Sequence, residues 1–179
     1  MIDAGHKMHI SAFNFVASCA EKFRSHFTFK DVLEVGSLDL NGSIKPLFVG
    51  CTYTGIDLVE GPNVDLVGHL LQHKFPLESF DVVVSLEAME HDEAWDKSLR
   101  EMFALLKPKG LLIITCATTG REEHGTHKSD PSASPATLDH YRNLTAWDFF
   151  SEIDVDSFSY ADFHFDSTVG DLHFMGIKK

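Results

Sequence analysis

Three short, almost continuously apolar segments constrain the fold of this chain most strongly: residues 31–35, 80–86 and 110–116. Segments of this length and composition are typical of strands buried inside a parallel sheet whose two faces are covered by helices. Weaker runs at 53–58 and 65–68 add two further strands. Open sheets of this kind bind ligands beyond the carboxyl ends of their strands, so the residues that follow each strand are the candidates for function.

Amphipathic helices alternate with these strands. Residues 10–27 place apolar side chains at spacings of three and four, with Ser11 as a candidate N-cap. Residues 92–107 repeat the pattern behind a candidate cap at Asp92. This alternation of strand and helix predicts an α/β chain in which helices cover both faces of a mostly parallel sheet.

The C-terminal part departs from the alternation. A capping box at Thr145 begins a short helix, and two runs at 155–165 and 171–178 flank a turn at 168–170. We expect these two runs to form an antiparallel hairpin at one side of the sheet. The aromatic residues of the first run are interpreted as sheet core and not as a ligand-stacking platform: Phe158, Tyr160, Phe163 and Phe165.

Length and composition bound the domain organisation and the partners. The 179 residues are 44% hydrophobic and 23% charged, which predicts one domain over residues 1–179, with an N-terminal helix within residues 1–30 and no membrane span. The net charge of −12 argues against a long nucleic-acid partner, because tracking phosphates requires clustered cations. The widely spaced Cys19, Cys51 and Cys116 predict reduced thiols in a cytoplasmic protein.

The ends of the first two strands carry a ligand-binding pattern. Gly36 follows the first strand, where the lack of a side chain lets the backbone approach a ligand. Asp57 ends the second strand 21 residues later, close to the spacing of an acidic residue that binds ribose hydroxyls, although Asp57 alone could equally be a turn residue. Leu38 stands where the dinucleotide-binding fingerprint requires glycine, which argues against a nicotinamide enzyme.

Five motifs occur in order along the chain: Glu34-Val-Gly36, Gly55-Ile-Asp57, residues 80–87, Glu90-His91 and residues 106–110. Their order and spacing over residues 31–117 resemble the class I S-adenosylmethionine-dependent methyltransferases, especially the small-molecule branch similar to the methyltransferase type 11 group. The resemblance implies a Rossmann-like, seven-stranded, mostly parallel sheet with a C-terminal antiparallel hairpin. It also implies S-adenosylmethionine as the cofactor and a small molecule as the methyl acceptor.

The loop after the first strand is the first cofactor-binding segment that the resemblance implies. Gly36, Ser37 and Asp39 would hold the methionine end of the cofactor. Glu34 would orient this loop from inside the strand.

The ends of the next three strands supply the remaining cofactor-binding residues that the resemblance implies. Asp57 would bind the ribose hydroxyls, and Leu58 would pack against the adenine. His69 and Leu70 would flank the adenine edge, and Glu87 would lie near the sulfonium.

Three residues are candidates for taking a proton from the acceptor. His91 follows the fourth strand beside Glu90, although a histidine that only caps or packs at a helix start is an equally strong interpretation. His124 and Tyr141 lie in the aperiodic residues 118–143, which leave the fifth strand. Long irregular segments of this kind often cover active sites, so we interpret residues 118–143 as a lid segment.

The sequence leaves two alternatives to methyl transfer open and does not support a metal site. His124 and His127 have no defined third ligand in the sequence, so we predict no metal site. A nucleotide-binding oxidoreductase of similar topology and a non-catalytic module that binds S-adenosylmethionine are the alternatives. The Asp/Asn-Pro-Pro-Tyr motif expected in many enzymes that methylate base amines is absent, and Ser-Leu-Glu-Ala stands at residues 85–88 instead, which argues against a nucleic-acid acceptor.

Overall fold

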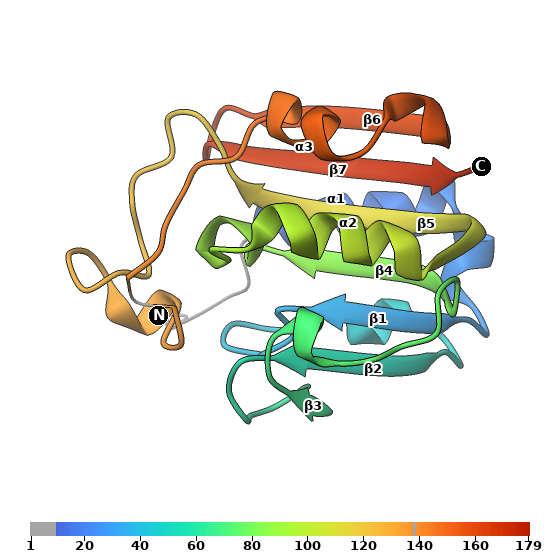
Figure 1. Cartoon of the computed structure of the whole chain (residues 1–179), viewed down its shortest axis with the longest axis horizontal. Helices are drawn as coiled ribbons and strands as arrows, with labels where there is room; N and C mark the ends of the chain where they lie inside the picture. The colour runs from blue at the N-terminus through green and yellow to red at the C-terminus, as the bar shows by residue number, and fades with distance from the viewer. Residues whose placement is uncertain (1–9, 138) are drawn as a thin grey trace, which may run out of the picture.

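The computed structural model of the chain describes residues 10–137 and 139–179, so the part of the expected N-terminal segment before residue 10 lies outside the described residues. Within these ranges the strands form one seven-stranded sheet in the order β3-β2-β1-β4-β5-β7-β6 (Figure 1). The strands are β1 Asp31–Val35, β2 Thr52–Asp57, β3 Leu66–Val67, β4 Phe80–Leu86, β5 Leu106–Ala117, β6 Phe158–Asp166 and β7 Asp171–Lys178. The predicted Rossmann-like α/β fold is confirmed.

The strand directions agree with the prediction of a mostly parallel sheet with a terminal hairpin. β1 pairs in parallel with β2 on one side and with β4 on the other. β2 also pairs in parallel with β3, and β4 pairs in parallel with β5. β7 runs antiparallel to both of its neighbours, β5 and β6. The turn of this hairpin reverses at Gly170, whose φ of +79° is accessible to a residue without a side chain.

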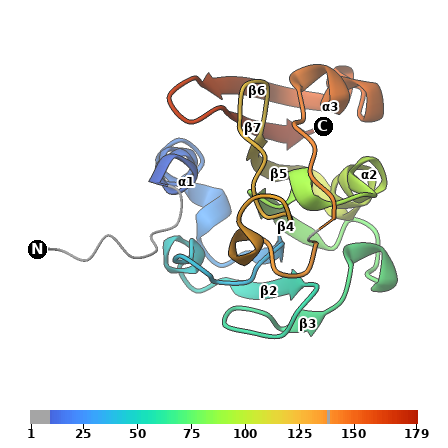
Figure 2. The same ribbon diagram turned by 90° about the vertical axis from the view of Figure 1, so that its left-hand side faces the viewer.

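Helices cover both faces of the sheet (Figure 2). α1 (Ile10–Lys22) lies on one face, and α2 (Trp95–Leu105) and α3 (Ala146–Glu152) lie on the other. No helix in the described ranges is long and apolar enough to cross a membrane.

Alternate residues of the central strands supply the two cores. Val32, Val82 and Ile113 share a core with α1, whereas Leu33 and Val83 share the opposite core with α2 and α3. All five side chains are fully buried. This two-sided burial is the physical reason why the strands are apolar without interruption.

The first helix is shorter than its apolar pattern predicts. It ends at Lys22, and a separate 3-10 turn (Arg24–Phe27) follows it. Ser11 is not the N-cap, because it lies inside α1 and its Oγ donates to Asp166 Oδ2 at 2.5 Å. The hydroxyl is therefore used in a contact across 155 residues of sequence, which local spacing does not reveal.

The boundary between α2 and β5 also differs from the prediction. α2 begins at Trp95, three residues late, so Asp92 is not its N-cap. The carboxylate still shapes the preceding turn, because Asp92 Oδ1 accepts a hydrogen bond from Ala94 N at 2.7 Å. β5 begins four residues early, since Leu106 already pairs with Phe80 across the sheet.

The interpretation of the terminal aromatic residues as core is wrong for Phe165. Phe158 is buried and Phe163 packs against the same core, but 52% of Phe165 is exposed. The reason is the length of α3, which has seven residues and covers Phe163 with Phe149 and Phe150 but does not reach Phe165. Strand alternation alone could not show where the covering helix ends.

Candidate active site

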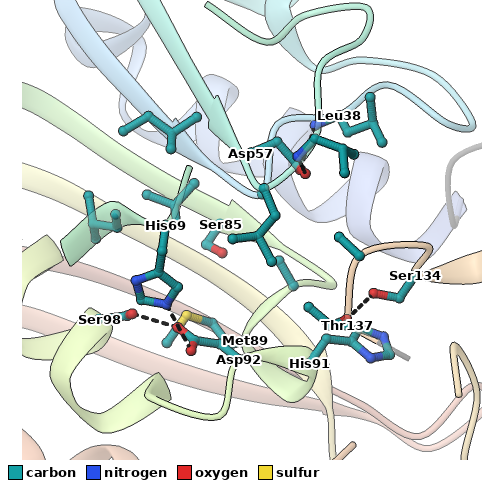
Figure 3. A pocket seen from close by; sticks show the side chains of 18 of the residues that line it. Leu38, Asp57, His69, Ser85, Met89, His91, Asp92, Ser98, Ser134 and Thr137 are labelled. Carbon is teal, nitrogen blue, oxygen red and sulfur yellow. Dashed lines mark hydrogen bonds and ion pairs between the residues drawn. The ribbon is translucent and has the colours of Figure 1, made fainter. Parts of the chain in front are cut away.

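A cavity of about 580 Å³ lies beyond the carboxyl ends of β1, β2 and β4 (Figure 3). Its position is the switch point at which the strand order reverses between β1 and β4, where open α/β sheets bind ligands. The sequence-predicted site residues that line it are Gly36, Asp57, Leu58, His69, Leu70, Glu87 and His91. The remaining predicted residues surround the cavity without lining it: Glu34, Ser37, Asp39, His124 and Tyr141.

Gly36 lies where the loops after β1 and β4 approach each other closely. Its φ is +77°, and a Cβ at this position would lie 2.3 Å from the Cβ of Ala88, far inside contact distance. The loops that follow β1 and β4 can therefore meet only because residue 36 is glycine. Their meeting forms the floor of the cavity between the two central strands.

Asp57 presents a fixed carboxylate to the cavity. Its Oδ2 accepts a hydrogen bond from Leu38 N at 3.0 Å, and its Oδ1 accepts one from Val59 N at 3.3 Å. A carboxylate can accept about four hydrogen bonds, so both oxygens keep capacity for further donors. The backbone thus orients an acceptor pair toward the cavity, which fits the pair of hydroxyls on a ribose.

His69 belongs to a hydrogen-bonded chain on the opposite wall. Its Nδ1 accepts from Leu71 N at 3.2 Å, and its Nε2 lies 3.0 Å from Asp92 Oδ1. Ser98 Oγ donates to the other oxygen of Asp92 at 2.5 Å. This chain ties the segment after β3 to α2. Sequence reasoning treated Asp92 only as a cap and missed its place on the cavity wall, although its position just after the fourth strand was an available signal.

Glu34 stabilises the loop after β1 from beneath. The buried carboxylate accepts hydrogen bonds at Oε2 from Tyr53 Oη at 2.8 Å and from Asn63 Nδ2 at 2.7 Å. Asn63 Nδ2 also lies 3.1 Å from the carbonyl oxygen of Ser37, which connects this loop to the segment between β2 and β3. Burial raises the pKa of Glu34 to about 7, although both hydrogen bonds act to lower it. Asp39 stabilises the turn that follows it, because its Oδ1 accepts a hydrogen bond from Gly42 N at 2.6 Å.

The end of β4 carries backbone strain. Glu87 has a φ of +50°, a conformation that residues with a side chain rarely adopt. Its N donates to Thr115 O at 2.9 Å, which fixes the strained residue to β5. Such strain persists only where the surrounding structure imposes it, and it is concentrated at functional sites.

Ser85 is a cavity residue that sequence reasoning did not assign to the site. Its side chain is fully buried, and its Oγ has no hydrogen-bond partner. A buried hydroxyl without a partner is unfavourable, and its position on the cavity wall leaves it available to a ligand. Its only signal in the sequence is its place at the end of a buried strand.

The three candidate bases converge beside the cavity. The ring centroid of His91 lies 5.1 Å from that of His124 and 5.6 Å from that of Tyr141, and the rings of His124 and Tyr141 are 4.9 Å apart. Burial and the neighbouring His124 lower the pKa of His91 to about 4, so this imidazole is neutral at pH 7 and can accept a proton. Burial also raises the pKa of Tyr141 above its usual range.

Part of the lid segment (residues 118–143) lines the cavity. Residues 133–137 of the lid segment line the cavity together with Asp139 and His140. At Gly125 the backbone packs so closely that a Cβ would lie 2.7 Å from Cε1 of His91. Sequence reasoning placed this segment over the site but could not select the lining residues, because the segment has no periodicity that separates an inner face from an outer one.

His124 and His127 do not lie together in the way that a metal-binding pair would. His127 is exposed, and its Nε2 lies 3.6 Å from Asp139 Oδ1. His124 turns toward His91 instead.

Residues 33–114 match the family model described as the methyltransferase domain. The match covers the strands and loops that form the cavity. This match supports the resemblance to the class I S-adenosylmethionine-dependent methyltransferases. The glycine floor, the oriented Asp57 carboxylate and the unpartnered Ser85 hydroxyl of the cavity fit S-adenosylmethionine, the cofactor that the resemblance implies.

Solved methyltransferase structures share this fold. Phosphoethanolamine N-methyltransferase 2 of Haemonchus contortus, solved with phosphomonomethylethanolamine and S-adenosylhomocysteine, is 15% identical with a TM-score of 0.65. The match covers 92% of this chain but 52% of that protein, so this chain spans about half of its length. The 1,6-didemethyltoxoflavin-N1-methyltransferase of Burkholderia thailandensis is 17% identical with a TM-score of 0.57, and the match covers 100% of this chain and 98% of that one. The comparison with curated proteins found no significant sequence match.

Proposed function

We propose that this methyltransferase transfers the methyl group of S-adenosylmethionine to an oxygen or nitrogen atom of a small molecule. One observation carries the proposal: a single cavity connects the residues suited to the cofactor, Gly36 and Asp57, with the buried His91. A volume of about 580 Å³ is within the range of small-molecule sites. The net charge of −12 and the covering lid segment argue against a long nucleic-acid acceptor.

The residues of the strand ends would bind and orient the cofactor. Asp57 would accept hydrogen bonds from the two ribose hydroxyls, and Leu58, His69 and Leu70 would enclose the adenine. The loop at Gly36 would hold the methionine end, with Ser37 and Asp39 shaping the loop and Glu34 fixing it from beneath. Glu87 would place a carboxylate near the positive sulfonium.

His91 is the proposed general base. A sulfonium methyl is already activated, so the protein needs to align the acceptor, exclude water and receive a proton where the acceptor carries one. The neutral imidazole of His91 lines the cavity and suits that last task. His124 and Tyr141 would position it through their ring contacts or act on the acceptor directly.

The lid segment would select the acceptor. Its cavity-facing part, residues 133–137, consists of Ala, Ser, Pro, Ala and Thr, which present small side chains and two hydroxyls. Such a wall suits a compact acceptor with at least one polar group. The free thiols of Cys19, Cys51 and Cys116 support a further proposal, that the protein works in the reducing cytoplasm.

Two measurements test the proposed function. Isothermal titration with S-adenosylhomocysteine and with NAD should show binding of the first alone; binding of NAD alone would overturn the proposal. Transfer of a radiolabelled methyl group to a panel of small hydroxyl and amine compounds should then identify an acceptor. Tight cofactor binding with no transfer to any acceptor class would favour the alternative of a non-catalytic cofactor-binding module.

A further inference from the structure

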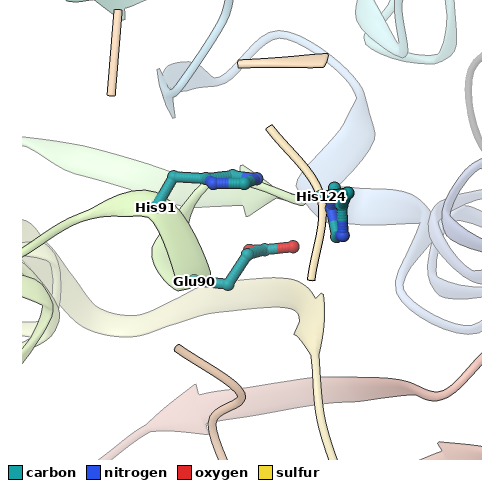
Figure 4. Close-up of side chains that lie close together, drawn as sticks. All are labelled: Glu90, His91 and His124. Atoms are coloured by element: carbon teal, nitrogen blue, oxygen red, sulfur yellow. The ribbon is translucent and has the colours of Figure 1, made fainter. Parts of the chain in front are cut away.

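Three metal-ligating side chains converge at the edge of the cavity. Glu90 and His91 lie in the 3-10 turn Met89–His91 after β4, and His124 lies in the lid segment, 33 residues further along the chain (Figure 4). One carboxylate oxygen of Glu90 and one ring nitrogen of each histidine all lie within 4.8 Å of one another. We propose that Glu90, His91 and His124 bind a divalent first-row transition metal ion.

Glu90 is the strongest reason for the proposal. Its side chain is completely buried, and while Oε1 accepts a hydrogen bond from Ala117 N at 3.1 Å, Oε2 has no hydrogen-bond partner. Burying a carboxylate oxygen without a donor or cation is costly, and buried carboxylates are normally paired or metal-bound. The nearby Arg121 forms its ion pair with Asp171, at 2.9 Å. A metal ion would supply the missing partner of Oε2.

The two histidines have the orientation of metal ligands. His124 Nδ1 lies 3.1 Å from the carbonyl oxygen of Glu122, and because a carbonyl only accepts, Nδ1 carries the proton and Nε2 carries the lone pair. His91 forms a hydrogen bond with the backbone of His140, and its Nδ1 is buried without a partner. Metal-binding histidines typically engage the second ring nitrogen in this way, which fixes the tautomer of the ring.

The donor set indicates the class of ion. Two imidazoles and one carboxylate suit Zn²⁺, Fe²⁺ and similar ions, whereas Mg²⁺ and Ca²⁺ prefer oxygen ligands alone. Metal–ligand distances of about 2.0–2.2 Å require neighbouring donor atoms closer together than 4.8 Å, a contraction that side-chain rotation can supply. Three protein ligands leave at least one coordination position open. Because His91 lines the cavity, that position can take an acceptor heteroatom, a consequence that rests on the proposed function. In the metal-bound state His91 is a ligand and not the general base, and the ion would instead lower the pKa of the bound acceptor.

Metal titration tests the site directly. Tag-free protein is treated with a chelator, dialysed and titrated calorimetrically with Zn²⁺. We expect one tight site per chain, and we expect His124→Ala and Glu90→Gln to weaken it by about 10- to 100-fold. His127→Ala is the matched control, because His127 lies in the same lid segment outside the cluster, and it should bind Zn²⁺ like the wild type. Circular dichroism shows which variants are folded. If Glu90→Gln does not fold, the comparison of His124→Ala with the wild type is sufficient to test the site.

The outcomes separate this inference from the proposed function. Wild-type protein that binds no Zn²⁺, or that binds it no more tightly than His124→Ala, would overturn the metal site. The same samples are titrated with S-adenosylhomocysteine, so cofactor binding without metal binding would leave the proposed function intact. A visible absorption spectrum of the Co²⁺-loaded protein that is lost in His124→Ala but retained in His127→Ala would support nitrogen ligation at this cluster.

Discussion

The cavity has two walls that are built in different ways. The strand-end wall, formed by the residues after β1, β2 and β4, is fixed by buried strands and by hydrogen bonds to backbone groups, as at Asp57. The lid wall, residues 133–137 with Asp139 and His140, is held by short contacts within the lid segment, such as that between Ser134 and Thr137. The strand-end wall lies almost entirely within the family match, and the lid wall lies outside it.

This difference fits the proposed function, in which the strand-end wall binds the cofactor and the lid wall selects the acceptor. A pocket for an invariant cofactor is best built on rigid strands, because its geometry has to be the same in every turnover. A surface that selects the acceptor can be built on a loop, since loops change in sequence and conformation without disturbing the core. The lid segment is nevertheless anchored where it rejoins the sheet, because Arg142 N donates to Glu90 O at 2.8 Å and Leu144 N donates to Ala117 O at 2.9 Å.

Removal of the lid tip should give the largest effect. Replacing residues 122–130 with a Gly-Ser linker should abolish methyl transfer and leave the affinity for S-adenosylhomocysteine within about threefold, because the strand-end wall remains. Arg121 is kept, since it pairs with the fully buried Asp171, and breaking a buried pair costs about 3–5 kcal/mol. Loss of cofactor binding in a folded variant would show that the two walls are not independent.

Mobility of the lid segment can be measured in the wild-type protein by hydrogen exchange. We expect backbone amides of residues 122–137 to exchange with solvent faster than those of β4 and β5, and to slow when cofactor and acceptor are both bound. Equal protection of both regions without ligand would contradict the comparison.

The Asp57→Ala substitution should weaken the strand-end wall selectively. Two charge-assisted hydrogen bonds to a ribose are worth about 1.5–3 kcal/mol each, so the affinity for S-adenosylhomocysteine should fall at least 100-fold, or about 3 kcal/mol. The measurement is isothermal titration of the folded variant.

Asp65→Ala provides the control for Asp57→Ala. Asp65 also accepts a backbone hydrogen bond, from Gly55 N at 2.8 Å, but its side chain does not line the cavity. It should bind the cofactor with nearly wild-type affinity. Equal losses of affinity in both variants would show that Asp57 stabilises the end of β2 and does not bind the ribose hydroxyls.

Alanine substitutions at Gly36 and Gly120 compare the packing of the strand-end wall with that of the lid segment. Gly36→Ala adds a Cβ 2.3 Å from Ala88 in a left-handed conformation, so the free energy of unfolding should fall by about 2–4 kcal/mol. Gly120→Ala, in the lid segment, has a φ of +95° but meets no atom within 4 Å, so strain alone should cost about 1 kcal/mol. Urea unfolding measures both; similar losses would contradict the tighter packing of the strand-end wall.

The buried Glu34 should make the free energy of unfolding depend on pH. Its folded pKa of about 7 is higher than that of an exposed glutamate, so the folded state holds this proton more tightly than the unfolded state. Stability is therefore lost as the pH rises, by about 2–3 kcal/mol between pH 5 and pH 8. Glu34→Gln should reduce this loss in urea titrations at both pH values. An unchanged pH dependence in the variant would show that Glu34 is charged throughout.

Local sequence patterns are sufficient to predict the sheet and the edge of the sheet at which the cavity lies. Strands such as residues 80–86 can be predicted because burial of both faces makes them apolar throughout. Gly36 and Asp57 can be predicted to lie close together because parallel strands end at the same edge of the sheet. The ordered motifs then produce the resemblance to a methyltransferase family, which the domain match over residues 33–114 supports. The assignment of individual site residues stays a prediction until ligand binding is measured.

Contacts between segments that are distant in the sequence are visible in the tertiary structure alone. The contact of Ser11 with Asp166, the exposure of Phe165 and the His69–Asp92–Ser98 chain depend on which elements lie side by side. The cluster of Glu90, His91 and His124 is the clearest case, because its third member comes from an aperiodic loop. Periodicity and spacing report local burial, whereas a loop is placed by long-range contacts that no short window of sequence contains.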